Sequence, residues 1–384
     1  MKITILVGGR FHAFDLAYQL EKKGHLLNLI TSYPKWKVSK FINIDKKKIK
    51  TVILKEIIER IIIKLKLINY LAIFSVYLNK YFEYFASKKV NYKNTDILIG
   101  WSGFSCKTFQ KSKNYNLIKI LERGSSHIKF QSDILLEEHK KFNIKYKIND
   151  NEINQEIKEY NLADYISIPS SFVKKTFLLK GFDEKKLILT PYGVDLNNFY
   201  PKAKKDNIFR FIYVGNLSLR KGLWYTLKAF NELNLPNSEL ILVGSVDANF
   251  LPLLKEFTSN KKIKLFNHVS QNKLVEFYNI SDVFVITSIE DGFAMVIPQA
   301  LACGLPVICS ENSGGSELIQ NGINGYVLPI RNIDELKKKM NFLYEDKKHY
   351  ISLKESIVKK REDLSWDHYG ELIIDRYGSL LKAV

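Results

Sequence analysis

The sequence predicts an α/β protein made of two doubly wound, Rossmann-like domains, each with a parallel sheet covered by helices. Short runs rich in isoleucine, leucine and valine alternate with longer segments whose apolar residues recur at helical spacing. The alternation begins again after about residue 186. The chain has 384 residues, a length typical of about two domains. We therefore expect domains over residues 1–185 and 186–365.

Five short apolar runs in the first half predict buried strands, because such runs are typical of parallel sheets covered on both faces. Residues 14–25 carry apolar side chains at helical spacing and predict a helix. Residues 40–66 alternate lysine with isoleucine and leucine, which predicts a basic amphipathic helix, and residues 67–79 are expected to continue it. The expected strands span residues 3–9, 26–32, 96–102, 118–125 and 164–170.

The second half repeats this architecture without repeating the sequence. Residues 186–195 lead into it, and a lysine-rich linker follows at 201–207. Pro298 lies inside one predicted helix, which is acceptable in the first turn or two, where backbone N–H groups lack intrahelical partners. The expected strands span 209–216, 239–245, 282–288 and 305–310, and the expected helices span 222–233 and 294–304.

The composition is that of an ordinary globular protein, with 46% hydrophobic and 26% charged residues. The net charge of +19 leaves three interpretations open: nucleic acid, an anionic membrane, or a lysine-rich composition without a partner. No nucleic-acid-binding motif supports the first. For residues 40–66, contact with anionic lipid and a solvated face over a core-facing stripe remain equally open.

Three features bound the cellular setting. Residues 1–10 read as a first strand, so we expect no signal peptide. No uncharged stretch reaches the length of about 18 residues that a membrane span needs. Cys106, Cys303 and Cys309 form no CxxC pair, so we expect reduced or buried thiols and neither a disulfide framework nor a structural zinc site.

Ligands of open α/β sheets bind beyond the carboxyl ends of the strands, so two facing domains place a site in the cleft between them. Arg220 and Lys221 follow a predicted strand and precede a helix, and with free backbone N–H groups they favour a pyrophosphate receptor. An exposed basic turn is the alternative. The loops expected to meet in the cleft span residues 8–10, 124–128, 215–222, 288–293 and 310–315.

Two acids and a glutamine mark the loop and helix that follow the strand at 282–288. Asp291 is better placed against sugar hydroxyls than against phosphate, because a carboxylate repels an anion. Gly292 and Phe293 are expected to begin the helix and to offer N–H groups to an anion. Gln299 lies about two turns further on and would face the cleft, although by itself it fits a satisfied polar group in a packed helix.

Other catalytic signals are sparse. His12 and His127 lie on loops of the first half, where a lone histidine is more often structural than catalytic. The chain has no DxD motif, which leaves a metal-bridged sugar nucleotide without support. It also lacks a Walker A motif, a GxGxxG fingerprint, a GxSxG elbow and an HExxH motif.

Taken together, the motifs resemble those of the retaining glycosyltransferases of family 4, which have the GT-B fold. The first half resembles the family more loosely, through GGRFHAFDLAYQL (8–20) and ERGSSH (122–127). The resemblance also implies a last helix, residues 366–384, that packs back on the first domain. The motifs of the second half are PYGVDLNNFYP (191–201), VGNLSLRKG (214–222), EDGFAMVIPQALACGLPVICSENSGGSELI (290–319), NGINGYVLP (321–329) and SWDHYGELIIDRYGSLL (365–381).

The resemblance gives roles to the acids. Asp291 matches the first acid of the family, which contacts the donor hexose, and the adjacent Glu290 is the alternative. Gln299 matches the second acid, which holds the ribose hydroxyls. Both positions differ from the usual glutamate: Asp291 keeps the charge on a shorter side chain, and Gln299 keeps only the hydrogen bonding.

The resemblance also gives roles to basic residues. Lys221 matches the diphosphate lysine of the family, and Arg220 is our candidate for the cation lost where Asn216 replaces the usual arginine. His127 matches the histidine that reaches the donor sugar. The catalytic candidates are His127, Glu290, Asp291 and Lys221, and the donor-binding candidates are Gly9, Asn216, Arg220, Lys221, Val269, Gly292, Phe293, Ala294 and Gln299.

The implied activity is transfer of a sugar, with retention, from a nucleotide diphosphate-sugar to a saccharide or lipid-linked saccharide. The resemblance implies neither a cofactor nor a metal. The basic charge favours a lipid-linked acceptor at the cytoplasmic face of the inner membrane, in surface polysaccharide or lipopolysaccharide assembly, and we expect no nucleic acid partner. Two alternatives remain: a sugar-nucleotide epimerase of the same fold, and a basic scaffold or nucleic-acid binder on a degenerate enzyme fold.

Overall fold

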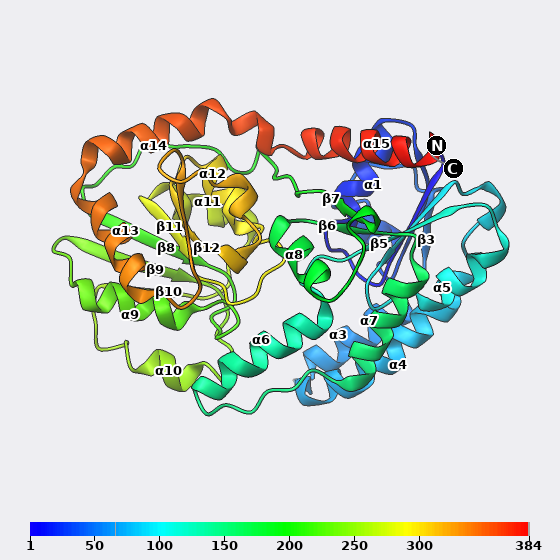
Figure 1. Cartoon of the computed structure of the whole chain (residues 1–384), viewed down its shortest axis with the longest axis horizontal. Coiled ribbons are helices and arrows are strands. Elements are labelled where there is room, and N and C mark those ends of the chain that lie inside the picture. The colour runs from blue at the N-terminus through cyan, green and yellow to red at the C-terminus, as the bar shows by residue number, and fades with distance from the viewer. Residues whose placement is uncertain (66, 383–384) are drawn as a thin grey trace.

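The computed structural model describes residues 1–65 and 67–382 and contains two parallel sheets in separate halves of the chain (Figure 1). In spatial order, the first sheet is β3 (Ile49–Thr51), β2 (Leu26–Thr31), β1 (Ile3–Val7), β4 (Ile97–Trp101), β5 (Ile118–Glu122), β6 (Tyr165–Ile168) and β7 (Leu187–Leu189). The second is β10 (Ile263–Phe266), β9 (Ser238–Val243), β8 (Phe209–Val214), β11 (Val283–Ile286), β12 (Val307–Ser310) and β13 (Gly325–Leu328). Both follow the doubly wound order that the sequence predicted.

Helices flank both faces of each sheet (Figure 1). In the first half they are α1 (Ala13–Lys22), α2 (Lys35–Val38), α3 (Leu54–Lys64), α4 (Ile68–Ser87), α5 (Cys106–Lys111), α6 (Ile128–Lys141), α7 (Asp150–Leu162) and α8 (Ser171–Leu179). In the second half they are α9 (Leu223–Leu233), α10 (Leu251–Lys255), α11 (Gln271–Asn279), α12 (Val296–Ala302), α13 (Ile333–Glu345), α14 (Lys347–Lys359) and α15 (Trp366–Lys382).

Each sheet is the centre of its own apolar core. Ile5, Ile99 and Ile120 lie side by side on β1, β4 and β5 and are fully buried. Strands β8, β11 and β12 build the second core in the same way. Because the central strands of each sheet are parallel, the loops after their carboxyl ends gather at one edge, where ligands of such sheets bind.

Helix α15 leaves the second half and packs on the first (Figure 1). Tyr369, Ile373 and Tyr377 are buried in the first core. Asp367 at the start of the helix accepts a hydrogen bond of 3.0 Å from Lys22 of α1. The first domain is accordingly the unit around the first sheet together with α15, and the second domain is the unit around the second sheet.

The segment 40–66 is not one basic amphipathic helix, contrary to the sequence-based prediction. It contains β3, which pairs with β2, and only α3 is helical. The prediction failed because an alternation of lysine and isoleucine suits a strand as well as a helix. Residue 66, at the end of that segment, and residues 383–384, at the end of the expected last helix, lie outside the described residues.

Two further boundaries differ from expectation. Strand β7 pairs with β6, so the first sheet extends past the boundary expected at residue 185. The helix expected at 294–304 begins only at Val296, which leaves Gly292 and Phe293 in the preceding loop rather than at a helix start. Pro298 is the third residue of α12 and lies in its first turn, where its missing N–H group needs no partner, as anticipated.

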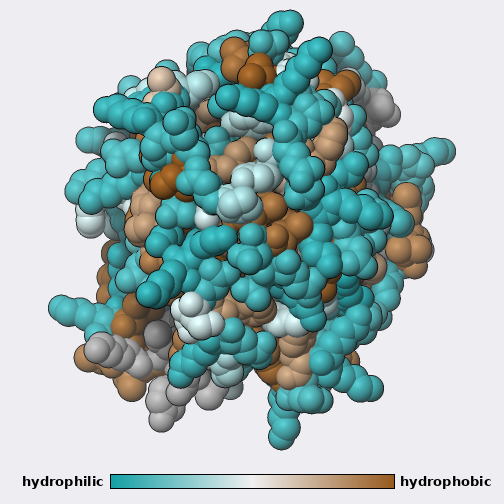
Figure 2. Space-filling view, turned by 90° about the vertical axis from the view of Figure 1, so that its left-hand side faces the viewer, coloured by the Kyte–Doolittle hydropathy of each residue, from teal (hydrophilic) through white to brown (hydrophobic). Residues whose placement is uncertain are grey.

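The polarity of the surface and the state of the cysteines are as the composition leads us to expect. Figure 2, which views the end formed by the second domain, shows a mainly hydrophilic surface with scattered apolar side chains. All three cysteines are buried and free of disulfides, as expected. Among the described residues, no helix is long and apolar enough to cross a membrane.

Candidate active site between the two domains

A cavity of about 900 Å³ lies between the two domains. The first domain lines it with His12 and Trp101, and the second with Gln299 and neighbouring residues. A smaller cavity of about 230 Å³ is lined by Asn216 and Arg220 of the second domain and by side chains of α6 and the loop after it. The loops predicted at 8–10 and 124–128 contribute to the larger cavity and the loop at 215–222 to the smaller one, whereas the loops at 288–293 and 310–315 line neither.

Arg220 and Glu290 form an ion pair between these cavities. The Arg220 Nη2 atom lies 2.8 Å from Glu290 Oε2, and Nε donates to the same oxygen at 2.9 Å. Glu290 is fully buried and also accepts hydrogen bonds from the first domain. The Ser126 N–H and hydroxyl donate to Oε1 at 3.0 and 2.8 Å, and Gln131 Nε2 donates to Oε2 at 3.0 Å. Glu290 thus binds both domains at once.

The Glu290 contacts belong to a longer buried network. Arg123 donates to the Ser126 carbonyl and to Gln131, and its Nη1 lies 2.9 Å from Glu156. Negative and positive side chains therefore alternate from Glu156 through Arg123 and Glu290 to Arg220. Burial of each charge is costly, and the alternation with full hydrogen bonding is what compensates that cost.

Both members of the central pair remain ionised. Burial by itself raises the pKa of Glu290, but the Arg220 charge and the two bonds from Ser126 outweigh it and hold that pKa below its ordinary value. Burial lowers the pKa of Arg220, and the nearby Glu290 carboxylate more than reverses this effect. A fixed positive charge therefore lies at the wall of the smaller cavity.

A second ion pair joins Lys221 to Asp291, directly beside the first. The loop that carries both acids is wedged against the first domain: the Ser170 hydroxyl donates to the Gly292 carbonyl at 2.7 Å. A Cβ atom on Gly292 would lie 2.1 Å from the Gly124 carbonyl oxygen, so only glycine allows this approach. The four charged candidates of the sequence, two cations and two acids, are thus brought together at the domain boundary.

Gln299 is mostly buried in α12 and lines the larger cavity. Its Oε1 atom accepts a hydrogen bond of 3.2 Å from the Tyr278 hydroxyl. It is therefore both a satisfied packed group and part of the cavity wall. Asp291 lines neither cavity, because its carboxylate faces Lys221. The structure does not bring the two positions of the acid motif to one cavity.

His127 does not reach the cleft, contrary to the sequence-based assignment. Its side chain caps α6 by accepting from the Lys129 N–H at 3.3 Å, and its ring packs among Tyr160, Phe177 and Phe182. Burial, assisted by the charge of nearby Arg123, lowers the pKa of His127 to about 4. The ring is a neutral core group, which is the structural interpretation that the sequence left open.

His12 is the histidine that lines the larger cavity. Its Nε2 atom lies 3.3 Å from Glu122 Oε2, and its ring centroid lies 3.9 Å from that of Tyr192. Because Glu122 ends β5 and is itself buried, the contact fixes the orientation of the imidazole. An oriented imidazole in a cavity wall can bind a hydroxyl group or move a proton.

The remaining donor candidates have mostly structural surroundings. Phe293 and Ala294 are buried, and Val269 packs against the second core. Gly9 follows β1 and accepts a hydrogen bond from Thr31 through its carbonyl. None of these four residues lines either cavity, whereas the neighbours of Gly9, residues 10–12, line the larger one.

Sequence reasoning missed the first-domain half of the charge network and gave no role to Arg123, Ser126 or Gln131. The signal that was present is Arg123 itself: an arginine directly after a buried strand needs a buried acidic partner. No local pattern points from this loop to Glu290, because Ser126 and Glu290 lie 164 positions apart in the chain.

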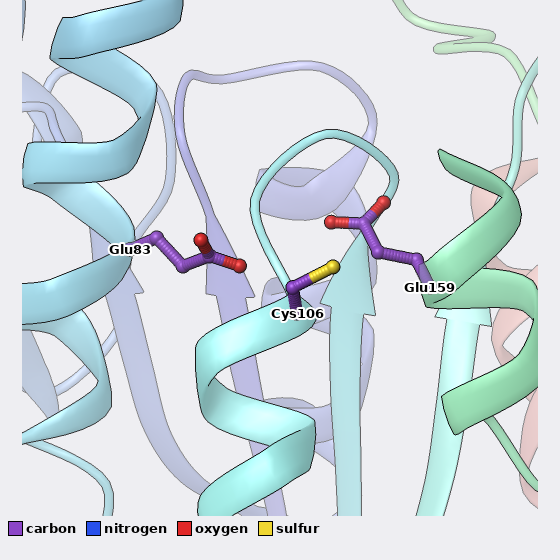
Figure 3. A group of neighbouring side chains, drawn as sticks. All are labelled: Glu83, Cys106 and Glu159. Carbon is purple, nitrogen blue, oxygen red and sulfur yellow. The ribbon is translucent and has the colours of Figure 1, made fainter. Parts of the chain in front are cut away.

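One further cluster of possible metal ligands lies away from the cleft. Figure 3 shows Glu83, Cys106 and Glu159 directed toward one another from α4, α5 and α7. Glu159 accepts hydrogen bonds from the backbone N–H groups of Gly103 and Ser105, and Glu83 accepts one from Lys107. These N–H groups occupy the oxygens that a cation would need, so the cluster holds the start of α5 and carries no metal proposal.

Residues 196–360 match the family Glycosyl transferases group 1. An N-acetylgalactosaminyltransferase of Campylobacter jejuni that acts on N,N'-diacetylbacillosaminyl-diphospho-undecaprenol is 25% identical over 53% of this chain and 56% of its own length. The UDP-Gal:α-D-GlcNAc-diphosphoundecaprenol α-1,3-galactosyltransferase of Escherichia coli is 28% identical over 50% of this chain and 56% of its own. The matches thus span little more than half the length of these curated relatives.

Solved structures extend the similarity of fold to the whole chain. Sucrose-phosphate synthase from Thermosynechococcus elongatus superposes with a TM-score of 0.72 at 16% identity, over 100% of both chains. HepE from Anabaena in complex with UDP gives 0.68 at 16% identity, over 99% of this chain and 100% of its own. Residues 196–360 of this chain are therefore similar to the glycosyl transferases group 1 family, and the whole chain has the GT-B fold.

Proposed function

We propose that this protein transfers a sugar, with retention of configuration, from a nucleoside diphosphate-sugar to a saccharide or lipid-linked saccharide. The observation that carries the proposal is the pair of cations, Arg220 and Lys221, at the domain boundary of a group 1 domain. Arg220 lines the smaller cavity and Lys221 follows it in the chain, and two positive charges so close together suit a diphosphate. They would neutralise the leaving group without a metal ion.

The acids give these cations their geometry. Glu290 holds Arg220, and Asp291 holds Lys221, so a bound diphosphate shares both cations with these carboxylates. We assign Glu290 to positioning, because every oxygen of it is already bonded inside the protein. Asp291 remains our candidate for the donor hexose once the diphosphate draws Lys221 away. Gln299, in the wall of the larger cavity, is our candidate for the ribose hydroxyls.

The reaction that suits these residues is a front-face displacement. The leaving diphosphate departs on the face from which the acceptor attacks and takes the acceptor proton, while Arg220 and Lys221 stabilise its charge. Glu122 is a buried carboxylate in the wall of the larger cavity. It is hydrogen-bonded to His12 and Tyr377 and is therefore not free to act as a covalent nucleophile. His12 replaces His127 in our assignment of the first-domain histidine that reaches the donor sugar.

We assign the acceptor to the lipid-linked class. The Campylobacter jejuni and Escherichia coli relatives act on diphosphoundecaprenol-linked sugars, and a third, from Salmonella typhimurium, is a lipopolysaccharide 1,2-N-acetylglucosaminetransferase, 27% identical over 56% of this chain and 61% of its own. Such an acceptor would place the work of this protein at the cytoplasmic face of the inner membrane. Assembly of a surface glycan is the corresponding process.

The first test is a thermal-shift panel of UDP-, GDP- and ADP-sugars, each with EDTA and with magnesium. A ligand at 100 times its dissociation constant stabilises a protein by about 2.7 kcal/mol, which is a readily measured shift. We expect one nucleotide class, and the same shift with EDTA. A panel in which no nucleotide shifts the melting temperature would overturn the proposal, and a shift that requires magnesium would overturn its metal-free form.

A further inference from the structure

Helix α3 is partly inverted: it exposes most of its apolar side chains, with Ile62 buried, and it buries two charged ones, whereas an ordinary surface helix buries its apolar face. Ile57 and Ile61 are 44% and 51% exposed, whereas Lys55 and Glu56 are 6% and 8% exposed. The helix has 11 residues and packs beside α4, so tertiary packing sets its orientation.

The buried charges of α3 explain why the helix keeps this orientation. Lys55 lies 2.7 Å from Glu59, and Glu56 accepts from Arg60 at 2.7 Å and from Lys37 of α2 at 3.3 Å. In the present orientation these charged side chains all have partners, and a buried charge is stable only when it is paired. Turning the helix to hide its isoleucines would break the contact between Glu56 and Lys37 of α2, whereas the two pairs within α3 would turn with it.

The exposed side carries a row of apolar side chains. Ile53, Ile57, Ile61 and Leu65 recur every four residues, so they lie along one line of the helix surface. Phe74 and Tyr77 of the adjacent α4 are 48% and 68% exposed. We call these six residues the apolar stripe. A stripe of this size on a surface marks a contact with another apolar body.

The surroundings of the stripe are basic and aromatic. Lys64 and Lys80 are exposed next to it in the chain. Trp36, beside Lys37, is 63% exposed, and Lys40 lies 5.1 Å from its ring centroid. Exposed isoleucines edged by lysine and tryptophan are typical of a surface that enters the interface of a bilayer. A two-fold contact with a second copy would instead bring these lysines toward one another.

The stripe is also connected to the larger cavity. Lys37 links α3 to α2 through Glu56. Phe41, shortly after α2, lines the cavity, and the Arg10 guanidinium lies 4.0 Å from its ring centroid. Lys40 also lines the cavity and lies 5.1 Å from the ring centroid of exposed Trp36, so a body that covers Trp36 would lie beside the first-domain wall of the cavity.

We propose that the apolar stripe docks on an anionic lipid bilayer and holds the mouth of the larger cavity at the membrane surface. A lipid-linked acceptor then reaches the cavity while its chain stays in the bilayer. Lysines outside the stripe add electrostatic attraction to anionic headgroups. The docking stands on the geometry of α3 and its neighbours; only the role in acceptor delivery rests on the proposed function.

The experiment is flotation of the full chain with phosphatidylcholine vesicles that contain or lack phosphatidylglycerol, at low and high salt. The double variant Ile57→Glu/Ile61→Glu should bind anionic vesicles at least about tenfold more weakly than the wild type. The matched control is Ile351→Glu/Val358→Glu on α14, where the two side chains are 45% and 53% exposed and the charge change is the same. We expect the control to bind within about twofold of the wild type.

A second pair of variants tests the electrostatic contribution. Lys64→Gln/Lys80→Gln should weaken binding to anionic vesicles by about tenfold, since each basic residue near the surface contributes to attraction. Lys347→Gln/Lys348→Gln on α14 is the control. Weak binding to vesicles of either composition by the wild type, or equal loss in the α3 and α14 variants, would overturn the proposal.

Two further measurements separate the alternatives. A dimer without lipid, abolished by Ile57→Glu/Ile61→Glu, would place a second copy on the stripe and overturn bilayer docking. The nucleotide thermal shift, run on each variant, distinguishes the two proposals: a nucleotide response without vesicle binding removes the docking and leaves the proposed function. Vesicle binding without a nucleotide response removes the proposed function and leaves the docking.

Discussion

The carboxylate of Glu290 is shared between Arg220 of the second domain and Ser126 of the first. It lies 2.8 Å from the Arg220 guanidinium and accepts two hydrogen bonds from Ser126. The arginine that we propose binds the diphosphate is therefore anchored to the opposite domain. Any change in the angle between the domains alters the position of that cation, so donor binding and domain closure are expected to be coupled.

Glu290→Gln should destabilise the protein, because the fully buried carboxylate loses its charge and half-buried Arg220 loses its counter-charge. Loss of one partner of a charged hydrogen bond costs about 1–3 kcal/mol. The folded state lowers the pKa of Glu290, so its contribution to stability is present above the unfolded pKa of about 4.3 and is lost as pH falls through the folded pKa.

The measurement is the free energy of unfolding in urea, from neutral pH down to the acid limit of the folded protein. The difference between wild type and variant should narrow as pH falls below about 4.3. Glu137→Gln, which breaks an exposed interdomain pair with Arg331, is the control and should cost at most about 1 kcal/mol. A constant difference at all pH values would contradict the assigned charge.

Arg220→Ala and Lys221→Ala should each weaken binding of the nucleotide donor by more than about tenfold, since each removes one charge-assisted contact to the diphosphate. The measurement is calorimetric titration with the nucleotide that shifts the melting temperature. The control Lys228→Ala on α9 removes a cation that pairs with Glu232 at 3.9 Å rather than with either acid of the site, and it should leave affinity unchanged. Wild-type affinity in both site variants would sink the assignment.

Gln299→Leu should lower nucleotide affinity, whereas Gln299→Glu should keep or strengthen it. The leucine keeps the volume but can accept no hydrogen bond from a ribose hydroxyl, a loss of about tenfold for one such bond. The glutamate still accepts the Tyr278 hydroxyl bond. Inorganic pyrophosphate, which has no ribose, is the control ligand, and its binding should not change in either variant. The comparison with the nucleotide shows whether the effect of the substitution arises at the ribose.

Variants of His12 and His127 should distinguish a catalytic histidine from a structural one. His12→Ala is expected to reduce turnover by about a hundredfold with a small effect on donor affinity, because the ring lies in the cavity wall. His127→Phe should leave turnover within about threefold of the wild type. Reduced turnover in His127→Phe and normal turnover in His12→Ala would restore the assignment that the sequence suggested.

His127→Phe also has a pH signature. The folded state lowers the pKa of His127 to about 4, so the wild type loses stability as pH falls from the unfolded pKa of about 6.5 toward 4. The variant lacks this proton-linked loss. Its free energy of unfolding should therefore decline less between neutral pH and about pH 5, and a parallel decline in both proteins would contradict the buried neutral imidazole.

The four strands that sequence reasoning did not identify are β3, β7, β10 and β13, and they are the four edges of the two sheets. The central strands were predictable because burial on both faces demands uninterrupted apolar runs. An edge strand is short and partly solvated, so its sequence carries no such constraint: three of the four residues of β10 are exposed.

At the site, the sequence located the loops and four charged residues, because these belong to short motifs with a recognisable order. It misplaced His127 and could not see that Glu290 is shared, since those facts depend on which side chains meet across the domain boundary. It likewise read the 40–66 segment as one basic amphipathic helix, with contact to anionic lipid and a solvated face equally open. The periodicity of the sequence shows that α3 has an apolar face. It does not show whether that face is directed toward the core or toward solvent, so the inversion of α3 could not be predicted.

The sequence by itself determined the two doubly wound sheets, the strand-end loops and the group 1 motifs, because each is written in local pattern and spacing. Only the tertiary structure decided which histidine faces the cavity, which acid anchors Arg220 and which face of α3 meets the outside. Those outcomes depend on the balance between burying a charge with its partner and burying an apolar side chain. That balance is settled by residues far apart in the chain, and no local stretch records it.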